Sequence, residues 1–248
     1  MNYLGVDGCK FGWCYWYLSH GSLLFGTAST LKKLFNQVDM ENTYCLIDMP
    51  IGFSDTNTPD RLCDKAARKQ LTKIRQSSVF SVPCKSAVYT NNYEDACEVN
   101  VSQLGKKLSK QTWGIVPKIR ALDEFRKNHS EFIIRESHPE VAFMSLAGVP
   151  LTSSKRSPEG IQERIDLLES LSTQLELALE QAFMITPKKV AMPDDIVDAL
   201  VLCMASQSVD RLVRLPREAD TDMFGNCREI VYPEIFERPV INHFATLG

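Results

Sequence analysis

Acidic side chains stand at the ends of three apolar segments of the sequence. The acids at these ends are Asp7, Asp48 and Glu136. A further group opens a later apolar segment and comprises Asp194, Asp195 and Asp198. Carboxylate oxygens are the ligands that Mg²⁺ and Mn²⁺ prefer. Carboxylates that gather at one place repel each other unless a cation neutralises them. The pattern therefore predicts a site for Mg²⁺ or Mn²⁺.

The last acidic group carries most of this prediction. Asp194 is expected to cap a helix, and Asp195 to gain from the helix dipole. Asp198 follows Asp195 by three residues, so both project from one helix face. The remainder of this helix is apolar almost all round, which predicts burial. A buried carboxylate needs a partner, and few basic residues lie nearby in the sequence, so a divalent cation is the candidate.

Each acid taken alone also fits an ordinary structural role. Asp7 precedes Gly8 and is typical of a turn, and Asp48 stands just before Pro50. Glu136 fits a solvated strand end equally well. The metal site is therefore predicted from the convergence of four elements, not from any single residue.

A cluster of this kind has a definite chemistry. Two divalent ions about 3.5–4 Å apart stabilise the attacking and leaving oxygens of an in-line phosphoryl displacement. Nucleases and some phosphatases work in this way. His138, two residues after Glu136, fits either a proton shuttle or the cap of a short helix.

The elements that must position these acids alternate between strand and helix patterns. Three short strands separated by turns containing glycine predict an antiparallel meander, and the later elements read as α/β. The predicted strands are 2–7, 12–19, 22–27, 43–49, 131–136 and, in the tail, 229–232. The predicted helices are 29–38, 59–75, 93–103, 113–128, 139–146, 158–183 and 193–206.

This order predicts a mixed sheet with helices on both faces, because parallel returns need right-handed crossovers. If the first strand is central, the fourth and fifth run parallel to it, and their carboxyl ends meet where α/β sites form. We expect one domain over 1–206 with a basic helical insertion at 54–130. The segment 207–248 is expected to pack on this domain as an extension.

Composition excludes several classes of protein. The 248 residues are 44% hydrophobic and 24% charged, with a net charge of −3, which excludes a disordered or fibrous chain. No apolar run reaches the roughly 18 residues of a membrane span, and the start does not read as a signal peptide. The eight cysteines lack the close spacing of a zinc site or a disulfide scaffold. We therefore expect a cytoplasmic protein without a membrane partner.

Basic residues are concentrated in the predicted insertion. Residues 61–127 hold 14 Lys and Arg against 6 Asp and Glu, interleaved with aromatic side chains. This pattern fits a clamp that positions phosphates and stacks bases of DNA or RNA, and it fits a helical lid with a solvated face equally well. The candidate substrate-binding residues are Lys10, Arg61, Arg68, Trp113 and Lys118.

Several short motifs, taken together and in order, resemble the domain-of-unknown-function 429 family, whose members are described as predicted RNase H-like nucleases. The likeness runs from about residue 4 to residue 206. The segment from Gly5 to Trp13 resembles the first strand of RNase H-like nucleases, and the late-helix acids resemble those of Holliday-junction resolvases. The other motifs are Asp48-Met49-Pro50-Ile51-Gly52, Arg61-x-Cys63-Asp64, Ser78-Val79-Phe80, Pro117-Lys118-Ile119, Glu136-x-His138-Pro139-Glu140 and Asp194-Asp195-x-x-Asp198-Ala199.

The resemblance implies an RNase H-like sheet of five strands in the order 3-2-1-4-5, with strand 2 antiparallel and the insertion between strands 4 and 5. It implies a metal-dependent nuclease. By position, the implied metal ligands are Asp7, Asp48, Asp195 and Asp198, with Glu136 as a fifth and Glu140 as its substitute. RNase H nucleases also take an acid from their first helix, and residues 29–38 contain none.

Two alternative functions stay open from the sequence. The first is a metal-dependent nucleotide phosphohydrolase or phosphotransferase on the same fold. No Gly-rich phosphate loop is present to favour it. The second is a module that binds nucleic acid or protein without catalysis and keeps the acids as scaffold. The net acidity of the chain argues mildly against tight nonspecific binding of DNA.

Overall fold

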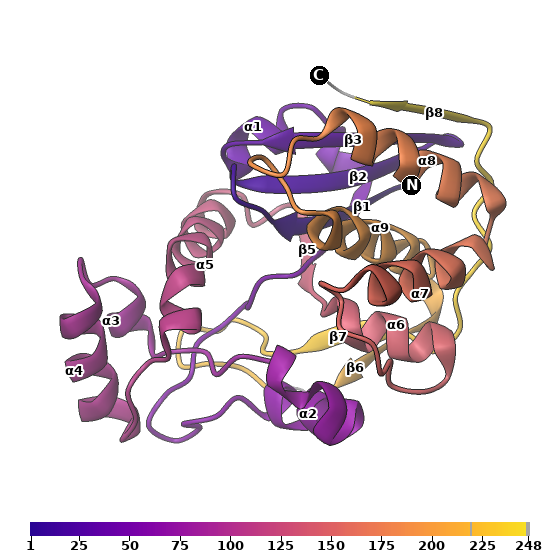
Figure 1. Cartoon of the computed structure of the whole chain (residues 1–248). Coiled ribbons are helices and arrows are strands. Elements are labelled where there is room, and N and C mark those ends of the chain that lie inside the picture. The colour runs from indigo at the N-terminus through magenta and orange to yellow at the C-terminus, as the bar shows by residue number, and fades with distance from the viewer. Residues whose placement is uncertain (219, 247–248) are drawn as a thin grey trace.

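The computed structural model describes residues 1–218 and 220–246. It begins with the predicted meander of strands β1 (Asn2–Gly8), β2 (Trp13–Ser19) and β3 (Ser22–Ala28). Strand β4 (Thr43–Ile47) then pairs parallel to β1, and β5 (Ile133–Glu136) pairs parallel to β4. This mixed α/β sheet, with helices on both faces, is the class that the sequence predicts (Figure 1).

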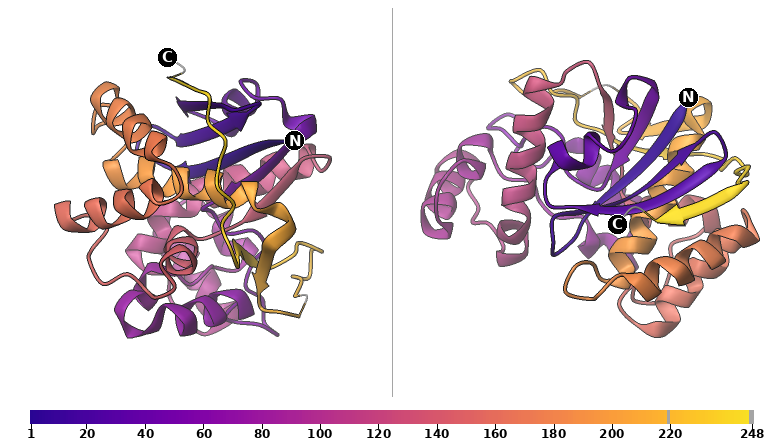
Figure 2. Two further views of the ribbon diagram at one scale, coloured as in Figure 1. Left: turned by 90° about the vertical axis from the view of Figure 1, so that its right-hand side faces the viewer. Right: turned by 90° about the horizontal axis from the view of Figure 1, so that it is seen from above.

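The sheet has six strands, one more than predicted. Its order is β5-β4-β1-β2-β3-β8, and the added strand β8 (His243–Thr246) pairs parallel to β3. The C-terminal segment reaches this position by running along the outside of the molecule (Figure 2). It also forms a separate two-stranded sheet from β6 (Leu212–Leu215) and β7 (Ile230–Pro233), of which only β7 was predicted.

Side chains alternate between the two faces of the central sheet. Strand β2 shows this clearly, since Trp16 packs in one apolar core and Tyr15 in the other. The first core lies under helices α6 (Pro139–Ala147), α7 (Pro158–Glu169), α8 (Thr173–Ile185) and α9 (Pro193–Gln207). The second lies under α1 (Leu31–Phe35) and α5 (Lys110–Asn128). The sheet therefore lies between two helical layers (Figure 2).

The insertion between β4 and β5 is helical, as predicted. It contains α2 (Leu62–Arg75), α3 (Lys85–Val88), α4 (Tyr93–Leu104) and α5, of which the short α3 was not predicted. Helices α3 and α4 extend beside α5, away from the sheet (Figure 1).

One predicted helix is wrong. Residues 158–183 form two helices, α7 and α8, because the chain turns between Glu169 and Thr173. Ser172 is extended there, and its side chain accepts a hydrogen bond from the backbone of Gln174, which starts a new helix. The apolar stripe continues through the break, so the hydrophobic pattern gave no signal of it. None of the helices in the described part of the chain could cross a membrane.

Candidate metal centre

Strands β1 and β4 place Asp7 and Asp48 side by side. Asp7 is the sixth residue of β1, and Asp48 follows the last residue of β4. The backbone N–H of Asp48 donates a hydrogen bond to the carbonyl of Val6 at 2.9 Å, so the two acids stand on neighbouring chains. Because side chains alternate along a strand, Asp48 shares the face of Leu46, which packs in the core under α9.

Helix α9 brings Asp195 and Asp198 to the same face. It packs across β1, β2 and β4. The Trp16 indole N–H donates to the carbonyl of Ile196 at 2.9 Å, which fixes the first turn of the helix on β2. Asp198 is completely buried in this interface.

The predicted cap of this helix is wrong by two residues. Met192 is the N-cap residue and Pro193 begins the helix. The carboxylate of Asp195 accepts a hydrogen bond from the Met192 backbone N–H at 2.8 Å, so Asp195 rather than Asp194 caps the helix. The proline accounts for the shift, since its missing N–H suits the first helical position.

A cavity of about 460 Å³ opens at this edge of the sheet, and Asp7, Asp48 and Asp195 line it. Burial raises the pKa of Asp7 well above its ordinary value, and the charges of the other three acids raise it further. Burial is also the main cause of the raised pKa of Asp48 and of Asp195, whose pKa reaches about 6. Asp7 thus lies within the electric fields of the other three carboxyl groups.

A lysine that the sequence analysis missed lies among these acids. The ammonium of Lys155, in the loop between α6 and α7, is 2.5 Å from Oδ2 of Asp198. Burial lowers the pKa of Lys155, but the charges of Asp198, Asp7 and Asp48 outweigh it, so the pKa is raised. One ammonium thus faces four carboxyl groups. Few basic residues lie near Asp198 in the sequence, and Lys155 is 43 residues away along the chain.

The chemistry of these oxygen donors suits a divalent cation, although no three of the four aspartates bring carboxylate oxygens within 4.8 Å of one another in the described part of the chain. Oδ1 of Asp198 is buried and has no hydrogen-bond partner among the described residues. An unpartnered buried carboxylate oxygen costs free energy, and a hard cation with oxygen ligands removes that cost. A single ammonium also leaves most of the charge of the cluster uncompensated. Asp7, Asp48, Asp195 and Asp198 are therefore the residues that could hold Mg²⁺ or Mn²⁺.

Glu136 lines the same cavity as Asp7, Asp48 and Asp195, but it leaves the sheet on the other face. In the parallel register it is opposite Ile47, which packs in the core under α5, and Ser137 donates its backbone N–H to the Ile47 carbonyl. The residue next to Asp48 on that side is therefore Ser137. A displacement of one residue along a strand moves a side chain to the other face.

The carboxylate of Glu136 is already neutralised by a buried arginine. Arg61, which is completely buried, donates to both oxygens of Glu136 and also to Oδ1 of Asp64 at 2.7 Å. The backbone N–H of Ile51 adds a bond to Glu136 at 2.6 Å. Arg61 was predicted to bind substrate, and this prediction is not compatible with its burial.

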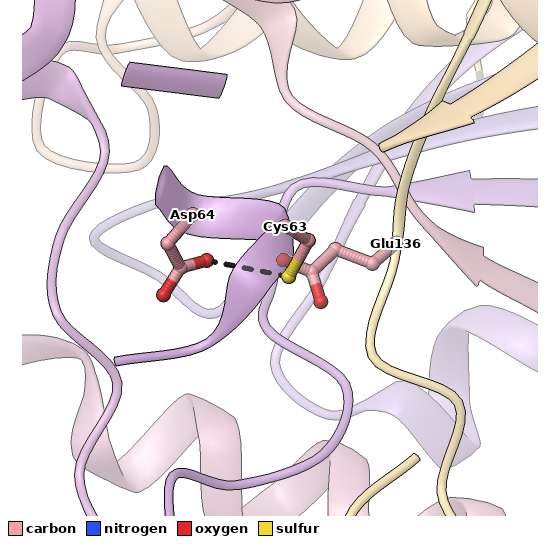
Figure 3. Close-up of side chains that lie close together, drawn as sticks. All are labelled: Cys63, Asp64 and Glu136. Atoms are coloured by element: carbon pink, nitrogen blue, oxygen red, sulfur yellow. Dashed lines mark hydrogen bonds between the residues drawn. The ribbon is translucent and has the colours of Figure 1, made fainter. Parts of the chain in front are cut away.

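Cys63, Asp64 and Glu136 also place one potential ligand atom each within 4.8 Å of one another (Figure 3). The guanidinium of Arg61 is bonded to both acids of this group, so a positive charge already stands where a cation would bind. Burial raises the pKa of the Cys63 thiol, which disfavours the thiolate that a metal would need. We therefore assign this group to the buried ion pair.

The residues after β5 have structural contacts. His138 caps α6, since its Nδ1 accepts the backbone N–H of Glu140 at 3.2 Å, and its Nε2 lies 3.3 Å from the carbonyl of Ser78. Of the two roles open for His138, the structure shows the helix cap. Because both ring nitrogens contact backbone groups, His138 is not part of the proposed catalytic set. Glu140, the substitute for Glu136, is paired with the buried Arg164 at 2.6 Å.

The other predicted substrate-binding residues lie in three different places. Lys10 and Lys118 line cavities at the acidic cluster, and Lys118 extends over Gly8. Arg68 lines a separate cavity of about 470 Å³ beside α4. Trp113 instead packs edge-on against Tyr93 in the insertion, with ring centroids 6.1 Å apart.

Lys155 and its neighbours were missed because nothing local marks them. Lys155 and Arg156 stand between serines in an irregular loop, a composition typical of any solvated turn. Only the packing of α7 on α9, which brings the starts of both helices together and which the sequence does not show, places them beside the acids.

A family model described as "Protein of unknown function (DUF429)" matches residues 5–221, and the chain belongs to this family. Neither the curated proteins nor the solved structures contain a match to the chain.

Proposed function

We propose that this member of the DUF429 family is a nuclease that hydrolyses phosphodiester bonds with Mg²⁺ or Mn²⁺. The observation that carries the proposal is the cluster of Asp7 and Asp198, which are buried, with Asp48 and Asp195, which are half-buried. Three of these carboxyl groups have raised pKa values, and one buried oxygen of the fourth lacks a partner. We further propose that the fold is RNase H-like, which the run β3-β2-β1-β4-β5 within the sheet supports.

Each side chain has a distinct task in this proposal. Asp7 from β1, Asp48 after β4, and Asp195 and Asp198 from α9 would hold the ions. When bound, two such ions activate the attacking water and stabilise the leaving 3′-oxygen. Lys118, which reaches over Gly8 into the cavity, would contact a phosphate oxygen of the substrate.

The charges around the cluster support a phosphodiester substrate. The acidic cavity shares Ser77, Val79 and Phe80 with the cavity beside α4, which Arg68, Lys106 and Lys107 line. On the opposite side it adjoins a second basic cavity. A negative centre between two basic ends suits a polyanion whose backbone is held on both sides of the bond to be cut.

Metal binding is tested by thermal unfolding. Saturating Mn²⁺, at about 100 times its Kd, should raise the melting temperature by roughly 5–10 °C. Asp7→Asn and Asp198→Asn should abolish the rise, and Asp166→Asn, an exposed acid on α7, should keep it. Metal-free Asp7→Asn should melt no lower than the natural protein, because it has one charge fewer in the cluster. An equal rise in all four proteins would contradict the site.

Catalysis is tested with a panel of single-stranded, duplex, branched and RNA–DNA hybrid oligonucleotides. At least one should be cut with Mn²⁺, and Asp7→Asn should cut none. Turnover of free nucleotides alone would indicate the phosphohydrolase or phosphotransferase. Metal binding without any turnover would indicate a non-catalytic binding module.

A further inference from the structure

A second cavity of about 930 Å³ lies next to the acidic one. The two share a wall, so the second cavity opens directly beside the proposed cutting site. Its volume is in the upper range of small-molecule and nucleotide pockets, which span about 300–1,000 Å³. Its lining residues come from β1, α5, α7, α8, the start of α9 and the loops around them. They include Lys10, Lys118, Lys188, Ile161, Phe183 and Met192.

The lining of this cavity is predominantly basic, with Lys or Arg at five positions against Asp194 and Asp195. Lys10, Lys118 and Lys188 line it and form no salt bridge with any residue in the described part of the chain, unlike Lys155 and Arg156. The ammonium of Lys10 lies 3.4 Å from the carbonyl of Lys188 and 3.6 Å from Sδ of Met192, both of which also line the cavity. Three unpaired cations around one opening suit phosphate groups.

The inner wall is apolar. Ile161 of α7, Phe183 of α8 and Met192 before α9 line it, and all three are half-buried, so each keeps a face toward the cavity. An aromatic ring with aliphatic neighbours is the surface on which an unpaired base stacks. A base inside a duplex is stacked and paired already, and it could enter only after being flipped out.

We propose that this cavity binds an unpaired nucleotide adjoining the bond that is cut, and that the substrate is single-stranded DNA or RNA. The inference rests on the proposed nuclease function and adds the substrate class. The lysines contact the phosphates on either side of the nucleotide, while its base lies against Phe183. The shared wall then places the next phosphodiester bond over the four aspartates.

The test measures binding without cutting, by fluorescence anisotropy of a labelled 12-nucleotide single strand and its duplex in EDTA. The single strand should bind at least tenfold more tightly than the duplex. Lys188→Glu should weaken single-strand binding about tenfold and reduce the slope of log K against log salt by about one. Lys189→Glu is the matched control, because Lys189 is the exposed neighbour outside the lining, and it should change binding less than twofold.

The contribution of the apolar wall is tested with a second matched pair of variants. Phe183→Ala should weaken single-strand binding about tenfold through loss of stacking, and Met184→Ala should not, since Met184 is 78% exposed beside it. Phe183→Leu replaces Phe183→Ala if thermal unfolding shows that the alanine variant does not fold.

Equal or tighter binding of the duplex would overturn the proposal, as would equal effects of Lys188→Glu and Lys189→Glu. Failure of the nuclease function is detected separately, with bis(4-nitrophenyl) phosphate and Mn²⁺. Hydrolysis of this small diester that is lost in Asp7→Asn would leave the nuclease function standing even where single-strand binding fails.

Discussion

At the scale of single residues, the central feature is an ammonium inside an acidic cluster. Lys155 neutralises part of the charge that Asp198 and its neighbours would otherwise leave uncompensated. Its side chain remains 31% exposed and is carried by an irregular loop, so it can leave toward solvent. In the proposed metal site, Lys155 would therefore compete with metal ions for the same carboxylates.

Replacing this lysine should separate its two effects. Lys155→Gln should lower the metal-free free energy of unfolding by about 1–3 kcal/mol, less than for a fully buried pair because the ammonium is partly solvated. The same variant should bind Mn²⁺ more tightly, because no cation has to be displaced. Titration calorimetry measures the affinity, and Arg156→Gln, whose side chain is 84% exposed, is the control. Unchanged or weaker Mn²⁺ affinity in Lys155→Gln would show that the lysine does not compete.

The residue scale also shows how far the sequence could predict the site. Asp7, Asp48, Asp195 and Asp198 were all identifiable, because each ends a strand or begins a buried helix. Glu136 was predicted on the same grounds, but it faces the opposite side of the sheet. The register of a parallel pair decides the face, and nothing in a single strand's sequence reveals that register.

At the scale of elements, the site depends on the close approach of α9 to β1. Gly5 makes this possible, since a Cβ atom there would lie 2.1 Å from the backbone N of Cys203 and 2.2 Å from the carbonyl O of Ala199. Both are main-chain atoms of the helix, so they cannot move without moving α9. The helix that carries Asp195 and Asp198 can therefore pack this closely on β1 only because residue 5 has no side chain.

Gly5→Ala should therefore damage both stability and metal binding. We expect a loss of about 3 kcal/mol or more, a fall in melting temperature of roughly 6–12 °C, and a smaller rise with Mn²⁺. Gly114→Ala is the matched control, because no atom lies within 4 Å of a Cβ there and the helix α5 gains about 0.5–1 kcal/mol. Similar melting temperatures for the two variants would contradict the tight contact.

Helices and strands could be predicted where the hydrophobic pattern of the segment itself indicates them. The meander, β4 and α9 follow from alternation and from apolar runs. The break between α7 and α8 interrupts no hydrophobic stripe, and β8 is a short strand whose only partner is β3, more than 200 residues earlier. Structure that depends on such distant pairing leaves no local trace in the sequence.

At the scale of the whole molecule, the cluster makes stability depend on pH. The pKa of Asp195 is raised to about 6 in the folded protein, against about 4 in an unfolded chain. Below pH 4 the group is protonated in both states and contributes nothing. Between pH 4 and 6 only the folded state keeps the proton, so the free energy of unfolding falls as pH rises, by up to about 1.4 kcal/mol per unit for each such proton.

The contribution of these acids should therefore make the metal-free protein in EDTA melt at a higher temperature at pH 5 than at pH 7.5. Asp195→Asn should flatten this dependence, while Asp166→Asn should not. Mn²⁺ should restore stability at pH 7.5, because the ion replaces the protons. Identical pH profiles for the two variants would show that Asp195 does not titrate in this range.

The contact between β1 and α9 joins parts of the chain almost 200 residues apart, which has a consequence for biosynthesis. During translation Asp7 leaves the ribosome early, and its contact with α9 cannot form until residue 198 has also been synthesised and released from the exit tunnel. Closing so long a loop costs only slowly increasing entropy, but it delays the final arrangement. The nascent chain thus carries no assembled cluster of the four aspartates, the proposed nuclease centre, while it is still close to ribosomal RNA and messenger RNA.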